Sequence, residues 1–292
     1  MPVATDAHRL RSDADRLASG YPALLAEAER VAAMVAAGVH GRRKPGQGET
    51  FWQYRPYDVS DPANRIDWRR SARGDSVFVR DTEWEAANSV YLWRDGSPGM
   101  EWRSSDRLPT KRDRASVLCL AVASLLMRGG ERCALLGESE RPRAGRVGYE
   151  RLATRMAGSD GTLDSLSGKL PAHAKLLISS DFLTDAESWQ ARLAALAARP
   201  STGVLLHIVD PAEETFPYRG RVEMRSPTGR LLPYLLGRAE RAQDEYRARF
   251  AAHLERIDAT ARHIGYTVVR HRTDQPPGPA LTALYQAFEG SL

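Results

Sequence analysis

In the stretch from Asn64 to Asp75, NRIDWRRSARGD, the carboxylate of Asp67 and the indole of Trp68 lie among four arginines. Asp67 can accept a bidentate pair from a guanidinium, and Trp68 offers a flat face to another. If these charges pair with one another, the cluster would fix this irregular segment, the arm, onto the sheet that is predicted below from residue 89 onward. Removing Asp67 from a buried site would then cost roughly 3 to 5 kcal/mol. We favour this clamp for Arg65, Asp67 and Trp68. Two roles, the clamp and an outward grip on an acidic partner, stay open for Arg69, Arg70 and Arg73.

Three further carboxylates, Asp95, Asp181 and Asp210, each follow directly on a short apolar run. The carboxyl ends of parallel strands meet at one edge of a sheet, which is where open α/β proteins bind ligands. Asp95, Ser97 and Asp181 present hard oxygen atoms that suit Mg²⁺ with retained waters. The simpler alternative is that Asp95 and Ser97 cap a turn while Asp181 caps a helix.

Asp95 and Ser97 resemble the first two residues of the D-x-S-x-S arrangement of von Willebrand factor type A domains. Gly99 stands at the third position, so one hydroxyl ligand is missing. Thr162 lies where that fold brings in a threonine. We therefore expect a degenerate site, with Mg²⁺ as the candidate cofactor and with four candidate ligands, Asp95, Ser97, Thr162 and Asp181.

Signatures of other catalytic sites are missing from the sequence. There is no P-loop, no G-x-G-x-x-G after a strand, no G-x-S-x-G and no H-E-x-x-H. The seven histidines form no cluster with ligand spacing, and His207, inside an apolar run, is expected to be a core residue. Glu213 and Glu214 fall in an expected loop and are predicted to be solvated. These observations favour a chain that is not an enzyme.

The 292-residue chain carries a formal charge of +5, and the excess is almost all arginine. Acidic residues interleave the arginines of the arm, which lowers the field that nucleic-acid binding requires, so nucleic acid is disfavoured as a partner. The longest apolar run, 115–127, is shorter than the roughly 20 residues of a membrane span. The first residues lack the apolar stretch of a secretion signal. We therefore expect a cytoplasmic protein with no membrane span.

From residue 89 onward, short apolar runs alternate with amphipathic stretches. Strands are expected at 89–94, 132–137, 174–180, 203–209 and 266–271. Helices are expected at 112–127, 186–198, 238–264 and 280–288. This alternation predicts an α/β fold, a doubly wound, mostly parallel sheet covered on both faces. Residues 146–149 are predicted to add one antiparallel edge strand, and residues 222–234 to form an exposed hairpin.

The residues ahead of the sheet divide into two parts. Apolar positions at steps of three and four predict a helical hairpin over 6–38. Periodicity then fades, and arginine, glycine, proline and aromatic residues form an irregular, Arg-rich arm. We divide the chain into an N-terminal helical hairpin at 1–40, a signature arm at 41–85 and an α/β domain at 86–292.

Residues 48–85 resemble the signature of a bacterial family known as domain of unknown function 58. That signature has a Gly and an aromatic, R-x-Y, an acidic turn, R-x-I-D-W-R-x-S-A-R and a short strand with an acidic end. The usual Gly-Asp of the turn is Ser60-Asp61 here. The matching positions are Phe51, Arg55, Tyr57, Asp61, Arg65, Ile66, Asp67, Trp68, Arg69, Ser71, Ala72 and Arg73.

The resemblance implies a von Willebrand factor type A-like fold and a functional link to MoxR-type AAA+ ATPases. Such pairs are thought to assist assembly or metal activation of other protein complexes. We therefore expect a non-catalytic interaction module that works with a MoxR-type ATPase on an unknown client protein. Two alternatives stay open. One is a Mg²⁺-dependent hydrolase that uses Asp95 and Asp181, and the other is a nucleic-acid-binding protein that uses the Arg/Trp-rich arm.

Overall fold

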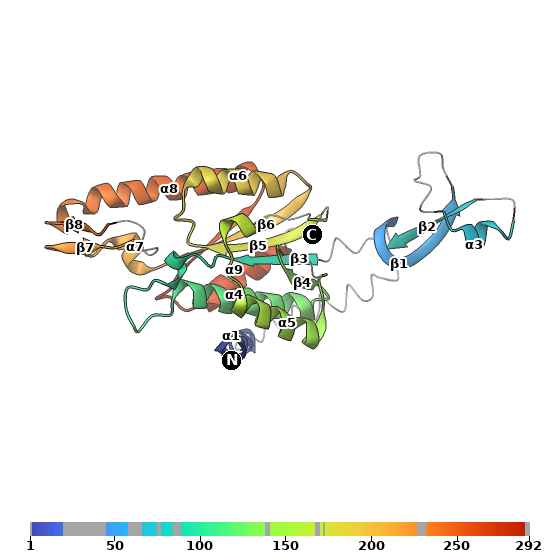
Figure 1. Cartoon of the computed structure of the whole chain (residues 1–292), viewed down its shortest axis with the longest axis horizontal. Coiled ribbons are helices and arrows are strands. Elements are labelled where there is room, and N and C mark those ends of the chain that lie inside the picture. Colours follow the sequence, from blue (N-terminus) through green and yellow to red (C-terminus); the bar gives the residue numbers. More distant parts are fainter. Residues whose placement is uncertain are drawn as a thin grey trace.

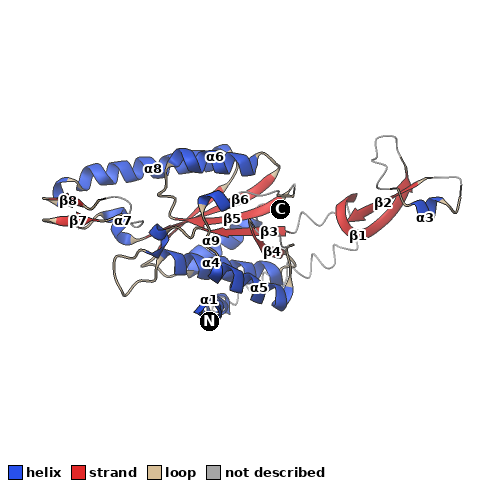
Figure 2. Cartoon of the chain, viewed as in Figure 1, coloured by secondary structure: helices blue, strands red, loops and turns tan. Residues whose placement is uncertain are grey.

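The computed structural model describes residues 2–19, 45–57, 66–74, 77–83, 89–137, 141–166, 170–171, 173–226 and 232–289. Its centre is a five-stranded sheet (Figures 1 and 2). In spatial order the strands are β4 (Arg132–Leu135), β3 (Ser89–Arg94), β5 (Ala174–Ser180), β6 (Ser201–Val209) and β9 (Thr267–Arg272). All neighbouring pairs run parallel. The prediction of an α/β fold with a mostly parallel sheet is confirmed.

Helices cover both faces of this sheet (Figure 1). One face carries α4 (Lys111–Arg128), α5 (Gly145–Gly158) and α9 (Gly278–Glu289), and the other carries α6 (Ala186–Ala197) and α8 (Gln243–His263). Strand side chains alternate between the two cores: Leu92 belongs to the first and Trp93 to the second. Burial on both faces explains why the strands read as continuous apolar runs.

The N-terminal helix α1 (Pro2–Ser19) forms an outer layer against α4 and α5 (Figure 1). It buries Leu10 and Ala14, one helical turn apart, in the core beneath it. The second helix expected for the N-terminal hairpin lies outside the described residues. So does the boundary between the hairpin and the arm, and the three-part division of the chain stays a prediction.

The prediction of an antiparallel edge strand at residues 146–149 is wrong. Those residues belong to α5, which buries Tyr149, Leu152 and Met156 at helical steps of three and four. The run R-V-G-Y alternates over only four residues, and the longer helical period wins because it buries a whole face. At this edge an isolated antiparallel bridge joins Arg143 to Cys133.

Short elements surround the carboxyl edge of the sheet. The 3-10 helix η3 (Pro98–Glu101) follows β3, and α7 (Pro211–Thr215) follows β6. The expected exposed hairpin is present as the antiparallel pair β7 (Val222–Met224) and β8 (Tyr234–Leu236). The 3-10 helices η4 (Leu163–Ser165) and η5 (Ala239–Arg241) precede β5 and α8. None of the described helices combines the length and the apolar character that crossing a bilayer requires.

The arm contains a second antiparallel unit, β1 (Pro45–Pro56) with β2 (Phe78–Glu83), and the one-turn helix α3 (Trp68–Ser71). The arm is therefore partly regular, contrary to the irregular segment predicted. Figure 1 shows this unit set apart from the five-stranded sheet. The expectation that the arm is fixed against the sheet is thus wrong for the part of it that the structure describes.

Candidate functional site at the carboxyl edge of the sheet

Three carboxylates predicted at strand ends lie together along one edge. Asp95, Asp181 and Asp210 follow β3, β5 and β6, which are adjacent strands of the sheet. The chain passes from β3 to β4 on one side and returns to β5 on the other, so β3 and β5 flank a topological switch point. Ligands of open α/β sheets bind at such points. All three carboxylates are nevertheless buried.

Asp95 is held by two hydroxyl-bearing residues. Its Oδ2 accepts a hydrogen bond from Ser180 Oγ at 2.6 Å, and its Oδ1 accepts one from the backbone N–H of Ser97 at 2.7 Å. Burial raises the pKa of Asp95, and these hydrogen bonds partly oppose that rise. Oδ1 therefore fixes the turn after β3, as in the capping alternative, and Oδ2 joins that turn to the end of β5.

Asp181 faces a lysine. Lys111, in the first turn of α4, places its Nζ 2.7 Å from Asp181 Oδ2 and also forms an ion pair with Glu213 Oε1. The Lys111 side chain is only 1% exposed. Burial by itself lowers the pKa of Lys111, but the two carboxylates outweigh burial and hold that pKa above its usual value. The ammonium ion is therefore charged and enclosed. Its Nζ lies 5.8 Å from the centroid of the Trp102 ring, within the range of a cation–π contact.

Glu213 and Asp210 complete this charged group. Asp210 caps α7 by accepting from Ala212 N at 2.8 Å, and its second oxygen accepts from Ser104 N at 2.9 Å. Glu213 Oε2 accepts from Asp210 N at 2.9 Å, which closes a capping box. The prediction that Glu213 is a solvated loop residue is wrong, because it lies on α7 and pairs with Lys111.

The geometry around Gly99 decides how well a metal would fit. A Cβ at position 99 would lie 3.3 Å from Asp181 Oδ2 and 3.9 Å from Ser97 Oγ, so these residues share one corner. Gly99 supplies no hydroxyl there, and Lys111 already occupies Asp181 Oδ2. Among the described residues no cluster of three or more His, Cys, Asp or Glu is placed to hold a metal ion. The donor set therefore does not fit Mg²⁺.

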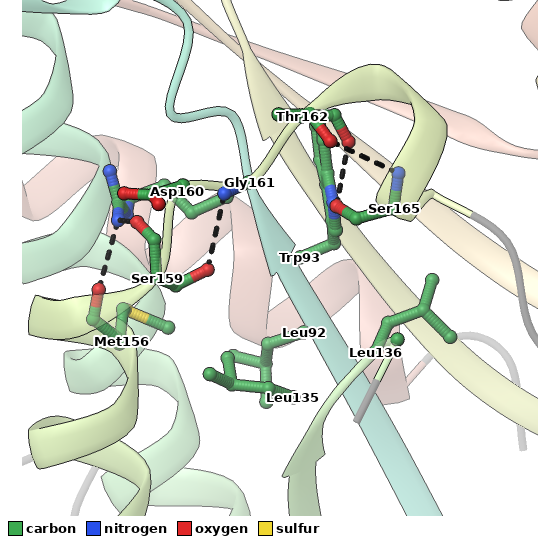
Figure 3. Close-up of a pocket in the computed structure, with 12 residues that line it drawn as sticks. Leu92, Trp93, Leu135, Leu136, Met156, Ser159, Asp160, Gly161, Thr162 and Ser165 are labelled. Atoms are coloured by element: carbon green, nitrogen blue, oxygen red, sulfur yellow. Dashed lines mark hydrogen bonds between the residues drawn. The ribbon is translucent and has the colours of Figure 1, made fainter. Parts of the chain in front are cut away.

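The structure places Thr162, the fourth candidate ligand, in a different setting. Its Oγ1 accepts from Ser165 N at 3.3 Å and caps η4, and it lines a separate cavity of about 250 Å³ beside Trp93 (Figure 3). The preceding Gly161 makes the close approach to the sheet. Gly96 N donates to Gly161 O at 3.0 Å, and a Cβ at Gly161 would lie 1.9 Å from Arg94 O. The segment that carries Gly161 and Thr162 therefore contacts the turn after β3 through its backbone atoms and not through the Thr162 side chain.

A groove of about 890 Å³ opens beside the buried charges. Its lining includes Ser97, Lys111 and Asp181, together with apolar and aromatic side chains from α7, α8 and β7. The aromatic part is continuous, since the Phe216 and Tyr246 rings stack with centroids 4.5 Å apart. The main apolar and aromatic members are Trp102, Leu183, Phe216, Tyr218, Met224 and Tyr246.

A family model described as "Protein of unknown function DUF58" matches residues 53–259. The chain belongs to the DUF58 family. Among solved structures, the chain is similar to the crystal structure of the conserved hypothetical protein BatB from Bacteroides thetaiotaomicron. The identity is 12% and the TM-score 0.37, over 70% of this chain and 98% of that one. No curated protein matches the chain.

The part of the DUF58 signature that the structure describes is stabilised within the arm itself. Asp67 Oδ1 caps α3 by accepting from Arg70 N at 3.0 Å. Ser71 Oγ donates to Asp67 O at 2.8 Å and accepts from Phe78 N at 2.9 Å, which joins α3 to β2. Arg70 lies 5.3 Å from the centroid of the Phe78 ring. Ser71 therefore links the helix to the strand, together with Arg70 and with Asp67, whose backbone N–H donates to Phe78 O at 2.9 Å.

The other signature residues behave differently from the predicted clamp. Trp68 is 66% exposed, so the expectation that it packs in a clamp against the sheet is wrong. Arg69, Arg70 and Arg73 are exposed, and Tyr57 is half-buried at the end of β1. Asp61 and Arg65 fall outside the described residues. Of Arg55 the structure describes only the backbone, which pairs with Val79 in β2.

Sequence reasoning missed Lys111 and Trp102 in this DUF58 chain. The sequence does not single out Lys111, because α4 opens with four charged residues in a row, Lys111 to Arg114, and the apolar part of the helix begins only after them. Its partners come from β5 and α7, about 70 and 100 residues further along the chain. No local spacing could have joined them.

Proposed function

We propose that this DUF58 chain is a non-catalytic protein-interaction module with a von Willebrand factor type A-like fold. Its proposed partner is a MoxR-type AAA+ ATPase, and the pair assists assembly or activation of another protein complex. Two things support the proposal: the membership in DUF58, and a parallel sheet whose carboxyl edge carries an open, largely apolar groove.

The groove is the single observation that carries this proposal. It lies at the edge where open α/β sheets bind ligands. Its lining combines aromatic rings with aliphatic side chains, the composition that supplies most binding energy at protein interfaces. Large apolar side chains are exposed in and next to it: Leu183 in the lining is 40% exposed, and Tyr234 and Leu235 on the neighbouring β8 are 67% and 48% exposed.

The hydrogen bonding of the acids favours binding over catalysis. A general base must reach a substrate proton with an available lone pair. Asp95, Asp181 and Asp210 are instead buried, and each of their oxygens accepts a hydrogen bond from the protein. A substrate of a hydrolase that used Asp95 and Asp181 would therefore have to reach carboxylates that the fold encloses.

A quantitative binding assay with the purified ATPase tests the proposal. We expect the wild-type chain to bind, and Leu183→Arg to weaken binding by about tenfold or more, because it places a charge in an apolar contact. Val147→Arg is the matched control, since Val147 is 62% exposed on α5, outside the groove lining. Failure of the wild-type chain to bind, with and without Mg²⁺ and ATP, would refute the proposal.

The arm offers a second contact of different chemistry. Arg69 and Arg73 are exposed on and beside α3, and Trp68 next to them is exposed as well. This arrangement favours an acidic surface on the partner, as in the outward-facing alternative for these arginines. The double variant Arg69→Glu/Arg73→Glu is expected to weaken ATPase binding and to reduce its salt dependence. Salt-dependent binding of random oligonucleotides, lost in the same variant, would favour nucleic acid instead.

A further inference from the structure

The corner formed by Lys111, Asp181 and Glu213 holds one cation between two carboxylates, as an occupied cation site does. A single ammonium group contacts one oxygen of each carboxylate, and it is 1% exposed. The remaining oxygens are also used: Asp181 Oδ1 accepts from Leu183 N at 3.0 Å, and Glu213 Oε2 accepts from Asp210 N at 2.9 Å. The corner therefore offers no carboxylate oxygen without a partner.

A divalent ion in this corner would need the same oxygens. Mg²⁺ requires near-octahedral oxygen coordination and usually binds through one or two carboxylates with retained waters. Asp181 Oδ2 would be the central ligand, since it lies closest to a Cβ built at Gly99. That oxygen is the one that accepts from Lys111 at 2.7 Å. Two cations cannot share it at these distances without strong repulsion.

We infer that the ammonium group of Lys111 is the resident cation of this corner and takes the place of a metal ion. The charge of Asp181 is then balanced by a cation of the chain itself, without divalent ions. Because the ammonium is enclosed, a carboxylate of a partner cannot bind to it, as it could to an open position on a metal ion. This inference rests on the proposed function, and under it partner binding at the groove does not depend on a divalent cation bound in this chain.

Mn²⁺ and Mg²⁺ titrations, followed by Mn²⁺ electron paramagnetic resonance and by the unfolding midpoint Tm, test the inference. The wild-type chain is expected to show no stoichiometric Mn²⁺ site and no saturable shift in Tm. Lys111→Ala frees Asp181 and Glu213 together and is expected to gain a saturable site, with Tm rising by roughly 3 °C or more at saturation. Adding Asp181→Asn to that variant should abolish the gain.

Lys175→Ala is the matched control. Lys175 is a second buried lysine, 2.8 Å from Glu131 Oε1, and it lies at the start of β5, the opposite end from Asp181. It contacts one carboxylate, so its loss should destabilise the chain without creating a two-carboxylate site. A gain in Lys111→Ala no larger than in Lys175→Ala would overturn the inference.

The wild-type titration decides the matter even if Lys111→Ala fails to fold. One Mn²⁺ bound stoichiometrically by the wild-type chain and lost on Asp181→Asn would overturn the inference, and no binding supports it. Lys111→Gln, which keeps a polar side chain of similar length, is a second variant and is also expected to gain Mn²⁺ binding. No partner protein enters these titrations, so their failure is distinguishable from failure of the proposed ATPase interaction.

Discussion

The arm and the carboxyl edge of the sheet use the same kinds of residues with opposite outcomes. Each brings together a carboxylate, a cationic side chain and a tryptophan. In the arm, Trp68 is 66% exposed and Asp67 accepts a backbone hydrogen bond. At the edge, Lys111 is 1% exposed, contacts two carboxylates and lies over Trp102. The buried clamp expected in the arm has its counterpart around Lys111.

Burial is what separates the two regions energetically. An exposed ion pair contributes about 0 to 1 kcal/mol, because water and salt screen it. Breaking a buried pair leaves a charge without water or partner and costs roughly 3 to 5 kcal/mol. The charge pattern of a sequence therefore does not tell how much each charge contributes to the free energy of unfolding. That contribution depends on how deeply the charged side chain is buried in the fold.

The largest effect is expected for Lys111→Met. This change leaves Asp181 and Glu213 buried without their shared cation, so the free energy of unfolding should fall by roughly 3 to 5 kcal/mol. Urea denaturation measures it. Arg262→Met is the exposed control, because Arg262 and Glu255 form an ion pair with side chains 65% and 69% exposed. That variant should lose at most about 1 kcal/mol. Equal losses in the two variants would contradict the comparison.

A pH titration of stability extends the comparison to a buried histidine. Burial, helped by the charge of Arg270, lowers the pKa of His207 to about 4 from an ordinary value of 6.5. Between these values the unfolded chain binds a proton that the folded chain does not. Stability from this group is therefore complete above pH 6.5 and decreases by about 3 kcal/mol as the pH falls to 4.

His207→Gln should remove that part of the pH dependence of the unfolding free energy. Replacing the exposed His263 with Gln should leave it in place. An unchanged slope in His207→Gln between pH 6.5 and 4 would show that the imidazole is not held neutral by burial.

A smaller effect is expected for Asp67→Ala in the arm. The side chain caps α3, and loss of such a cap costs about 1 kcal/mol, confined to the local unit. Hydrogen exchange should quicken at the amides of Arg70 and Phe78, which lie in α3 and β2. The urea midpoint of the sheet domain should not move. A loss of 3 kcal/mol or more would instead support the buried clamp that the sequence predicted for Asp67.

The smallest effect on stability is expected for Trp68→Ala. An exposed side chain away from caps and cores changes the unfolding free energy by about 0.5 kcal/mol or less. Urea denaturation of the variant measures this change. Binding to the proposed ATPase partner is the sharper readout, because a change in affinity without a change in stability would make the arm a contact surface.

The sheet was predictable because its evidence is local. Each buried strand is a short apolar run, and Asp95, Asp181 and Asp210 follow three of these runs directly, so their meeting at one edge follows from parallel topology. The edge strand at 146–149 failed because alternation over four residues cannot compete with the helical period of Tyr149, Leu152 and Met156.

The charge partners at the same edge were not predictable from local spacing. Glu213 looks like one of two solvated acids, and it becomes a partner of Lys111 only once α7 folds back over the start of α4. The role of Ser71 was hidden for a similar reason, since it depends on β2 returning beside α3. Residues whose role depends on a distant element carry little signal in their own neighbourhood.

The most direct test of the central claim is nitrogen-15 NMR of the lysine ammonium groups at neutral pH. The account predicts a slowly exchanging Nζ signal that disappears in Lys111→Met and does not respond to Mg²⁺. Its coupling should extend to the carboxyl carbons of Asp181 and Glu213, the two groups within contact. A Lys111 ammonium in fast exchange with water, or one that Mg²⁺ displaces, would contradict the account.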